Sequence, residues 1–533
     1  MVKFLDKNSG FSQWNANQAA SQKNATTKKS PFGGFLWWVV LFVASFWLIN
    51  SFLSPKKNQV AETTDTVVAV DVSGVPTSEI KSDKISATVQ GLRVSDIKLH
   101  EFAQNGAAGD DENAEPVSLL GAPDNFAEVG LLSTGTTAPG ATTVWRAVDG
   151  AQVWRNNDGV NFRRAYKTDG YVITITDEIK NNTKREISVA PYVRIMRDND
   201  VKSSAGVYTG AVAFVNSDIE HQDWKDMDRK SYAYSTTNGF VGFADQYWES
   251  VAAINRPDQT IRVKKIGDKY QADAAAAAVV IAPGATETIT THIFAGPRNQ
   301  EVLSTVATQI PGVNKTVDYG WFGFLARPML WALNAINSVV MNYGVAIIIF
   351  TLLLRLLIWP LTRKSYTSMM AMQKMQPEMA RIQKLYANDK PRMQMEMMRL
   401  YQTHKTSPMS GCLPMLIQIP IFFALYKALL ISVPMRSAHF LWISDLAAMD
   451  PYFILPILMG ATMWWQQHLQ TVAGPKTSAP GDPVAQTQRV MKWMPIVFTV
   501  LFAFMPAGLV LYWTVSNLFA IGQMYIIKRR TAK

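Results

Sequence analysis

The segment FTLLLRLLIWPLTRK, from Phe350 to Lys364, places one arginine, Arg355, within a run of almost wholly apolar residues. A permanent cation in such a run is a core residue with a buried partner, an anchor that reaches a membrane surface, or a functional centre. The choice between these interpretations depends on whether the segment crosses a membrane and on which polar groups accompany it there.

The chain combines a soluble part with an apolar part. Of its 533 residues, 48% are hydrophobic and only 17% are charged, and the long apolar runs are confined to residues 35–53 and 338–527. The net charge of +11 suits contact with anionic lipid or with RNA and does not decide between them. Cys412 is the only cysteine, and no glycine-rich nucleotide-binding motif occurs, so we predict no disulfide framework, no cysteine metal centre and no cofactor.

Length and hydropathy predict six membrane-spanning helices, because about 20 apolar residues cross the roughly 30 Å hydrocarbon core. One helix is an N-terminal anchor that follows a disordered cytoplasmic tail at residues 1–33, and the other five form a C-terminal core. The anchor is expected at residues 34–54 and the core helices at residues 338–361, 410–433, 451–468, 493–505 and 508–527.

The distribution of Lys and Arg orients these helices, because basic loops stay on the cytoplasmic side. The segment from Arg363 to Lys405 holds nine Lys/Arg against three Asp/Glu, which predicts a cytoplasmic helical hairpin at residues 363–407. The loop at residues 469–492 and the tail at residues 528–533 are also basic, so the chain between them must cross the membrane twice. The sequence MPAG, residues 505–508, provides the break between those two crossings.

Residues 55–310 have the pattern of a soluble β-domain on the outer side of the membrane. Runs such as YVITIT (171–176) and ETITTHIFAG (287–296) mix β-branched and aromatic residues with polar ones, and turn signals separate many such runs. These features predict a large exported antiparallel β-sandwich. Between this domain and the core, residues 318–336 predict an interfacial amphipathic helix on the outer leaflet.

The predicted topology places Arg355 about 12 Å inside the cytoplasmic end of its helix. Snorkelling is disfavoured because helical side chains lean toward the helix N-terminus, which here points away from the cytoplasm. None of the six predicted spans contains Asp or Glu, so no carboxylate partner is available within them. We therefore expect Arg355 to be the cation of a wet cavity inside the membrane, with Thr351, Gln418 and Asn517 as polar neighbours.

Two interpretations remain open for a row of methionines at helical spacing in the hairpin. The row forms either the seam of the hairpin or an adaptable apolar surface for varied client segments, and both can hold at once. These methionines are Met369, Met372, Met375 and Met379. Basic residues of the hairpin and the tail predict a contact with ribosomal RNA or anionic lipid, which salt weakens. They are Arg381, Lys384 and Arg392 in the hairpin and Lys528, Arg529 and Arg530 in the tail.

Four stretches of the C-terminal part resemble the YidC-type membrane protein insertases, in the form found in bacteria with two membranes. They are RLLIWPLTRKSYTSMMAMQKMQPEM (355–379), GCLPMLIQIPIFFALYKAL (411–429), LWISDLAAMDPYFILPILMGATM (441–463) and PAGLVLYWTVSNLF (506–519). With the anchor and the β-domain, the resemblance covers nearly the whole chain. Two departures are a long tail before the first span and Trp513, at a position that is often tyrosine in relatives.

The resemblance implies a hydrophilic groove that is open to the cytoplasm and to lipid but closed outside, with Arg355 in it. Its other lining residues would be Thr351, Gln418, Trp513 and Asn517. It also implies an exported domain of the sugar-enzyme-like β-sandwich type that lacks that activity, in a protein of the bacterial inner membrane with both termini cytoplasmic. The implied partners are nascent membrane proteins, the ribosome, the Sec translocon (SecYEG and SecDF) and the phospholipid bilayer.

The function predicted from these features is that of a membrane protein insertase and assembly chaperone, which is not an enzyme. One alternative is a secondary transporter that uses Arg355 to anchor an anionic solute, although such proteins usually show internal repeats that are not evident here. Another places the function in the exported domain, as a polysaccharide-binding or structural module. Removal of residues 60–300 discriminates between them, because an insertase core keeps most of its function without that domain.

Overall fold

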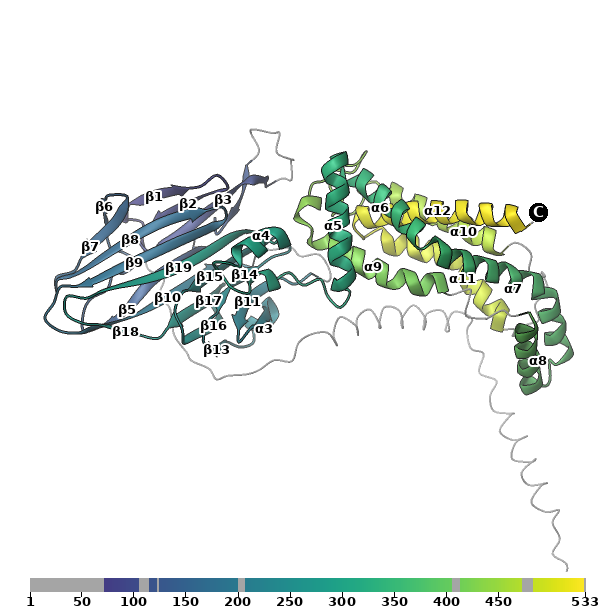
Figure 1. Cartoon of the computed structure of the whole chain (residues 1–533), viewed down its shortest axis with the longest axis horizontal. Coiled ribbons are helices and arrows are strands. Elements are labelled where there is room, and N and C mark those ends of the chain that lie inside the picture. The colour runs from purple at the N-terminus through teal and green to yellow at the C-terminus, as the bar shows by residue number, and fades with distance from the viewer. Residues whose placement is uncertain are drawn as a thin grey trace, which may run out of the picture. The chain divides into compact units, whose positions relative to one another are not determined.

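The computed structural model describes residues 71–104, 115–121, 124–199, 207–404, 413–471 and 483–531 (Figure 1). The predicted cytoplasmic tail at residues 1–33 and the anchor at residues 34–54 lie outside the described residues. Within the described part, the chain up to residue 471 and the chain from Pro495 onward belong to one compact unit.

The N-terminal part of the described chain forms two antiparallel β-sheets that share one hydrophobic core. The first has ten strands, in the order β1-β2-β3-β5-β10-β17-β16-β13 with β4 paired to β3 and β18 to β10, and the second has nine, in the order β12-β11-β14-β15-β19-β9-β8-β7-β6. The first sheet contains β1 (Thr77–Lys81), β2 (Ile85–Gln90), β3 (Arg93–Ala103), β4 (Pro116–Leu119), β5 (Phe126–Thr134), β10 (Ile187–Arg197), β13 (Tyr232–Thr236), β16 (Gln259–Ile266), β17 (Lys269–Ala276) and β18 (Val279–Ile281). The second contains β6 (Arg146–Val148), β7 (Ala151–Arg155), β8 (Val160–Asp169), β9 (Val172–Asn181), β11 (Gly210–Val215), β12 (Asp218–Asp223), β14 (Phe240–Ala244), β15 (Trp248–Ile254) and β19 (Thr286–Pro297).

Alternation along the strands explains why these segments pair face to face. In β10, Val189, Val193 and Ile195 are fully buried between the sheets, whereas Tyr192 and Arg194 lie on the other face. A period of two places every second residue on the same side of a sheet, so one apolar face is buried along each strand. The prediction of an antiparallel β-domain is confirmed, and both of the runs quoted from it fall on strands, β9 and β19.

A buried ion pair ties the two sheets together. Arg164 on β8 and Asp177 on β9 occupy directly opposed positions and are 1% and 5% exposed, respectively. The guanidinium of Arg164 donates from Nε to Asp177 Oδ1 at 2.7 Å and from Nη2 to Oδ2 at 2.8 Å, while Nη1 donates to the carbonyl of Val129 on β5 at 2.9 Å. Burial lowers the pKa of Arg164, but the attraction of Asp177 outweighs this effect and raises the pKa overall, so the guanidinium stays ionised.

The C-terminal part of the described chain is helical (Figure 1). Two short helices, α3 (Trp224–Met227) and α4 (Gln300–Val306), belong to the β-domain, and the 3-10 turn η1 (Val313–Lys315) leads out of it. The longer helices are α5 (Gly323–Val340), α6 (Tyr343–Leu357), α7 (Trp359–Leu385), α8 (Lys390–Thr403), α9 (Leu413–Ile431), α10 (Ile454–Thr471), α11 (Pro483–Phe502) and α12 (Ala507–Thr531), with a 3-10 turn η3 (Val433–Met435) after α9.

The boundary between α5 and α6 lies later than the sequence pattern predicts. Met341 adopts a left-handed backbone conformation with φ of 51°, and the side chain of Asn342 accepts a hydrogen bond from the amide of Val345. Asn342 is thus an N-cap, and the two residues together end one helix and begin the next. The helix predicted at residues 318–336 therefore spans Gly323–Val340 as α5, and its interfacial placement stays a prediction.

The helix that carries Arg355 does not continue straight into the hairpin. It ends at Leu357, and α7 begins at Trp359 with a bend of 65° between the two axes. Pro360 stands in the first turn of α7, where its missing amide hydrogen leaves no intrahelical bond unmade. Trp359, at the bend, packs edge-on against Phe519 of α12, with 5.7 Å between the two ring centres.

Among the residues described, the helix Ala507–Arg529 is long and apolar enough to span a membrane by itself, and the bent pair α6–α7 qualifies if it counts as one broken span. Leu416–Ile431 and Lys492–Phe502 are shorter apolar helices. These lengths leave the predicted number of six spans untested.

Candidate functional site

Three helices converge on the guanidinium of Arg355. The arginine lies in the last turn of α6 and is half-buried. Its Nε donates to the hydroxyl of Ser516 on α12 at 2.6 Å, its Nη2 donates to the same hydroxyl, and Nη2 also lies 3.4 Å from Gln418 Oε1 on α9. The segment quoted at the outset thus brings its one cation into contact with two polar side chains from distant parts of the chain.

A second layer of polar groups fixes the partners of Arg355. Gln418 uses its Nε2 to donate to the hydroxyl of Tyr512 at 2.8 Å, so its carbonyl oxygen points toward the guanidinium. Tyr512 and Ser516 are each 1% exposed. They are four residues apart on α12 and therefore share one face of that helix. Sequence reasoning missed both residues, although this spacing of two polar side chains in an apolar helix was a signal that identifies such a face.

The hydrogen-bond partners of Arg355 in the described part of the chain are neutral side chains. Its charge is solvated by dipoles rather than cancelled by a carboxylate. Burial of a charge without a counter-ion leaves it able to attract an anion that enters the site. The site thus holds a positive charge against neutral polar side chains within a largely apolar group of helices.

The other predicted groove residues make different contacts. Thr351 is fully buried and its hydroxyl donates to the carbonyl of Ile347, one turn earlier in α6. Asn517 is 5% exposed, and its amide donates to Thr462 Oγ1 at 3.2 Å on α10 rather than to Arg355. Trp513 meets aromatic rings on α9 and α11. They are Phe422 at 5.5 Å, Phe498 at 6.1 Å and Phe502 at 5.0 Å. The structure therefore brings Gln418 to Arg355 and gives Thr351, Asn517 and Trp513 other neighbours.

Comparison with known proteins decides the family. Residues 335–533 match the family described as 60Kd inner membrane protein, and residues 77–332 match the YidC periplasmic domain. The membrane protein insertase YidC of Methylobacillus flagellatus is 40% identical over 393 residues, which are 71% of this chain and 68% of that protein. The protein of the same name from Rickettsia bellii is 33% identical over 523 residues, 89% of this chain and 91% of that protein.

The chain belongs to the YidC family. It is accordingly an inner membrane protein with a periplasmic domain. Among solved structures, an active YidC insertase with its first transmembrane domain resolved is similar over 85% of this chain, with 18% identity and a TM-score of 0.36. A galactose mutarotase-like protein from Lactobacillus casei is similar over 41% of the chain, with 9% identity and a TM-score of 0.30.

In this YidC-family chain, the loop at residues 432–453 covers the end of the helical core that lies opposite the hairpin. The ring of Phe440 lies against Gly344 at the start of α6, where an added Cβ would collide with it. The amide of Gly508, at the start of α12, donates to the carbonyl of Leu446 at 2.9 Å. Asp450, which is 1% exposed, holds the end of the loop by accepting from the amide of Leu455 at 2.7 Å. The loop is therefore bonded to the ends of several helices.

Replacement of Gly344 by leucine is expected to displace Phe440 and open this cover. In a Cys412→Ser background, a cysteine placed at Ser516 should then react several-fold faster with a membrane-impermeant maleimide added from the periplasmic side. Gly522→Leu is the matched control, because an added Cβ there meets open space. Equal labelling in Gly344→Leu and the unchanged chain would show that Phe440 does not seal the core.

The hairpin α7–α8 of the YidC-family core places the predicted methionines in two kinds of environment. Met375 is 3% exposed, whereas Met369, Met372 and Met379 are half-buried. Met369 packs with Met370 against a small cluster formed by Tyr366 of α7 and by Met524 and Ile527 of α12. Met369 therefore packs on the end of α12, and the hairpin seam stays a prediction for this row.

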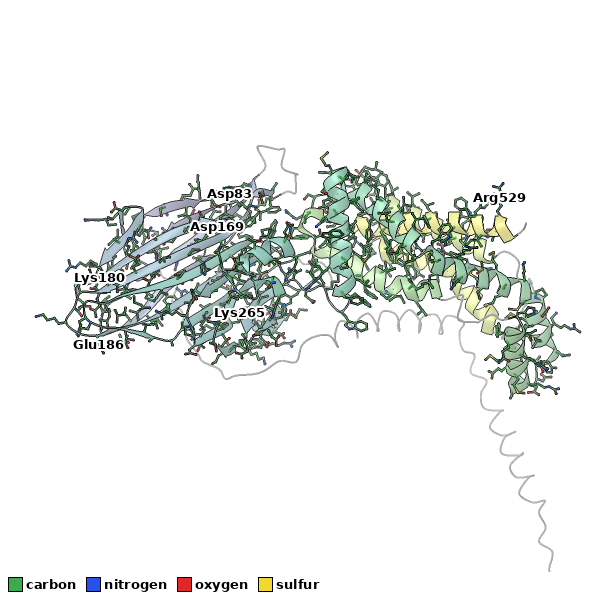
Figure 2. All side chains as sticks on the ribbon, viewed as in Figure 1. Asp83, Asp169, Lys180, Glu186, Lys265 and Arg529 are labelled. Atoms are coloured by element: carbon green, nitrogen blue, oxygen red, sulfur yellow. The ribbon has the colours of Figure 1, made fainter. Side chains whose placement is uncertain are left out.

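The basic residues lie mostly on the surface. Arg381, Lys384 and Arg392 are exposed, and Arg529 is exposed at the end of α12 (Figure 2). Lys528 is half-buried and donates to the carbonyl of Leu469 at 2.7 Å, and the side chain of Arg530 lies outside the described atoms. The exposed cations are available to a polyanion, while Lys528 also ties α12 to the end of α10.

Proposed function

We propose that this chain is a membrane protein insertase and assembly chaperone, and that Arg355 is the charged centre of its intramembrane groove. Hydrophobic segments of nascent proteins would pass from the cytoplasm into the inner membrane along this groove, alone or with the Sec translocon. The observation that carries the proposal is a cation held by Ser516 and Gln418, without a counter-ion among its described partners, inside an apolar helical core. The insertase names of the relatives support it.

The energetics of insertion divide between the client and the groove. Burial of the client's apolar surface in lipid supplies roughly 25 cal/mol per Å², so the transfer needs no nucleotide. The obstacle is the polar flank that must cross, because an ionised side chain at mid-membrane costs about 3 kcal/mol even on insertion scales. Water and dipoles around Arg355 would lower that barrier, and its charge would favour acidic flanks.

The topology we propose has six spans, with both termini cytoplasmic and the β-domain periplasmic. It places the hairpin α7–α8 in the cytoplasm and the loop at residues 432–453 outside, so that the cover over Gly344 closes the outer end of the groove. The basic loops support this orientation through the positive-inside rule. The secondary-transporter alternative gains no support, since the relatives named above are insertases.

Site-specific photo-crosslinking during translation tests the function. A photoreactive residue at Gln418 or Ser516 should crosslink to a short nascent membrane protein while its hydrophobic segment is entering. Leu518 is the matched control, because it lies two residues from Ser516 on α12 and is 49% exposed on the outside of the helix bundle. Nascent chains that crosslink at Leu518 but never at Gln418 or Ser516 would contradict the proposal that clients pass along a groove at Arg355.

The basic tail is expected to make a modest contribution to ribosome binding. Replacement of Lys528, Arg529, Arg530 and Lys533 by glutamine should lower co-sedimentation with ribosomes at least about fourfold, since four exposed charge contacts of roughly 0.2–1 kcal/mol each sum to about 0.8 kcal/mol or more. The exposed Lys180 of the β-domain, labelled in Figure 2, provides a control substitution that leaves binding unchanged. Unchanged co-sedimentation of the fourfold variant, at low and high salt alike, would remove the tail from the mechanism.

A further inference from the structure

The segment at residues 245–249, which comprises the turn between β14 and β15 and the first two residues of β15, makes contacts well beyond its own sheet. We call it the junction segment. Its members include Asp245, Gln246, Trp248 and Glu249, and the first, second and fourth of these are at least nine-tenths buried. Buried polar side chains at the end of a sheet need partners from elsewhere in the chain. Here the partners come from two places. One is the linker between α4 and α5, residues 307–322, and the other is the helical core.

The junction segment is hydrogen-bonded to the linker at Thr316, which is fully buried. Glu249 Oε2 accepts the hydroxyl hydrogen bond of Thr316 at 2.7 Å. Arg298, which follows β19, donates from Nη2 to the carbonyl of Thr316 and from Nη1 to the carbonyl of Asp245 at 2.6 Å. Side chain and backbone of Thr316 are thus both held, just where the chain turns toward α5.

The same segment reaches the helical core. The amide of Gln246 donates to the carbonyl of Leu430, near the end of α9, at 2.9 Å. The guanidinium of Arg436, in the loop that covers the core, lies 5.6 Å from the centre of the Trp248 ring and donates to the carbonyl of Gln104 at 2.7 Å. The linker and the covering loop therefore both contact the junction segment, and the covering loop is also bonded to the end of β3.

Glu249 is the weak point of this arrangement. Its Oε1 has no hydrogen-bond partner among the described residues, and Arg298 Nε lies 3.6 Å from Oε2, which is too far for a hydrogen bond. Burial raises the pKa of Glu249 to about 7, an effect that Arg298 and Thr316 oppose and Asp245 reinforces. Burial and the charge of Arg298 lower the pKa of the nearby His221 on β12 to about 4, with Asp318 acting in the opposite sense. Between pH 6 and 8.5 Glu249 therefore titrates and His221 stays neutral.

We propose that the junction segment is a pH-responsive joint, through which the periplasmic domain holds the linker at Thr316 and is thereby fixed to the membrane core. With the carboxyl of Glu249 neutral, the hydroxyl of Thr316 is bonded in a dry site and the linker is held. With the carboxyl ionised, one hydrogen bond and an arginine at 3.6 Å that makes no hydrogen bond to it do not compensate for the lost hydration, so water enters and Thr316 is released. The joint is firmer in acidic surroundings and looser above neutrality.

The sign and size of the effect follow from linkage. The held state binds the proton of Glu249 more tightly than the released state, in which the carboxyl has its ordinary pKa of 4.5. Stability of the held state is therefore fully present below that value and is lost as pH rises through about 7. From pH 6 to pH 8.5 the released fraction should rise about tenfold.

Limited proteolysis of the full chain in lipid nanodiscs measures this release. Cleavage after Tyr319, which is 5% exposed in the held state, is identified by the mass of the fragments. At low protease concentration its rate follows the released fraction. Each rate is divided by the rate for Glu249→Gln at the same pH, which cancels the pH dependence of the protease itself. Glu249→Gln is suitable because its amide keeps an acceptor for Thr316 and does not ionise.

The normalised rate of the unchanged chain should rise about tenfold between pH 6 and 8.5. Thr316→Val should be cleaved several-fold faster at both pH values, and Thr316→Ser, which keeps the hydroxyl, should behave as the unchanged chain. Glu178→Gln, a substitution on the exposed face of β9, is the control for altered charge. A normalised rate that does not change with pH, or a Thr316→Val rate equal to that of the unchanged chain, overturns the joint.

Discussion

Removal of the charge at position 355 is expected to abolish insertion of clients with acidic translocated tails and to spare clients with neutral tails. Two unit charges 4 Å apart interact by about 4 kcal/mol at an effective dielectric near 20, so loss of the whole attraction lowers insertion by up to about a thousandfold. Arg355→Ala should show this selectivity. Arg355→Glu should be worst for acidic clients and should partly rescue basic ones.

The lysine variant separates charge from geometry. Arg355→Lys keeps the positive charge but cannot bond Ser516 through two nitrogen atoms as the guanidinium does. It should retain most activity if charge in a solvated groove is what matters. Ser516→Ala, which keeps the arginine and removes its main partner, should likewise be mild.

Protease protection of a client series that differs only in tail charge provides the measurement, in membranes that contain equal amounts of each variant. Equal losses for acidic and neutral tails in Arg355→Ala would assign the arginine a structural role. In that outcome its charge keeps the groove hydrated through Ser516 and Gln418, and attraction of the client plays no part.

The largest loss of stability is expected from Asp177→Asn in the β-domain. This change leaves the guanidinium of Arg164 buried between the sheets without its anion, and removal of one partner of a buried ion pair costs about 3–5 kcal/mol. Among the described residues no other carboxylate bonds to Arg164, since its remaining hydrogen bond goes to the carbonyl of Val129.

A double replacement, Arg164→Met with Asp177→Leu, should recover most of that loss, because apolar residues of similar volume often replace a buried pair at little cost. Arg163→Gln is the surface control, since Arg163 pairs with Glu178 at 3.3 Å with both side chains more than two-fifths exposed. Guanidinium unfolding of the full chain, followed by the far-ultraviolet signal of the β-domain, gives the free energies. A loss below 1 kcal/mol in Asp177→Asn would show that water reaches Arg164.

The alternation of β-branched and polar residues sufficed to predict the antiparallel β-domain, because it depends only on neighbours along one strand. The pairing of Arg164 with Asp177 was not predictable in this way, since it requires the register between β8 and β9. In the sequence both residues resemble the ordinary polar positions of a surface strand.

The candidate site was likewise predictable from the sequence only in part. The lone arginine in an apolar run and the polar Gln418 were evident from composition, and their contact is present at 3.4 Å. Whether Ser516 or its neighbour Asn517 contacts Arg355 depends on the rotation of α12 about its axis, because adjacent residues point about 100° apart on a helix. Ser516 faces α6, and Asn517 faces Thr462 on α10.

The 65° bend between α6 and α7 lies a few residues after Arg355 and turns the hairpin away from the axis of α6. With 27 residues, α7 is about 40 Å long. The first turns of α7 pack on α12 through Tyr366 and Met369, so a swing of the hairpin starts beyond Met369 and leaves the backbone next to Arg355 in place. We infer that the far part of the hairpin can change its position to meet clients of different sizes while the charge of Arg355 stays fixed.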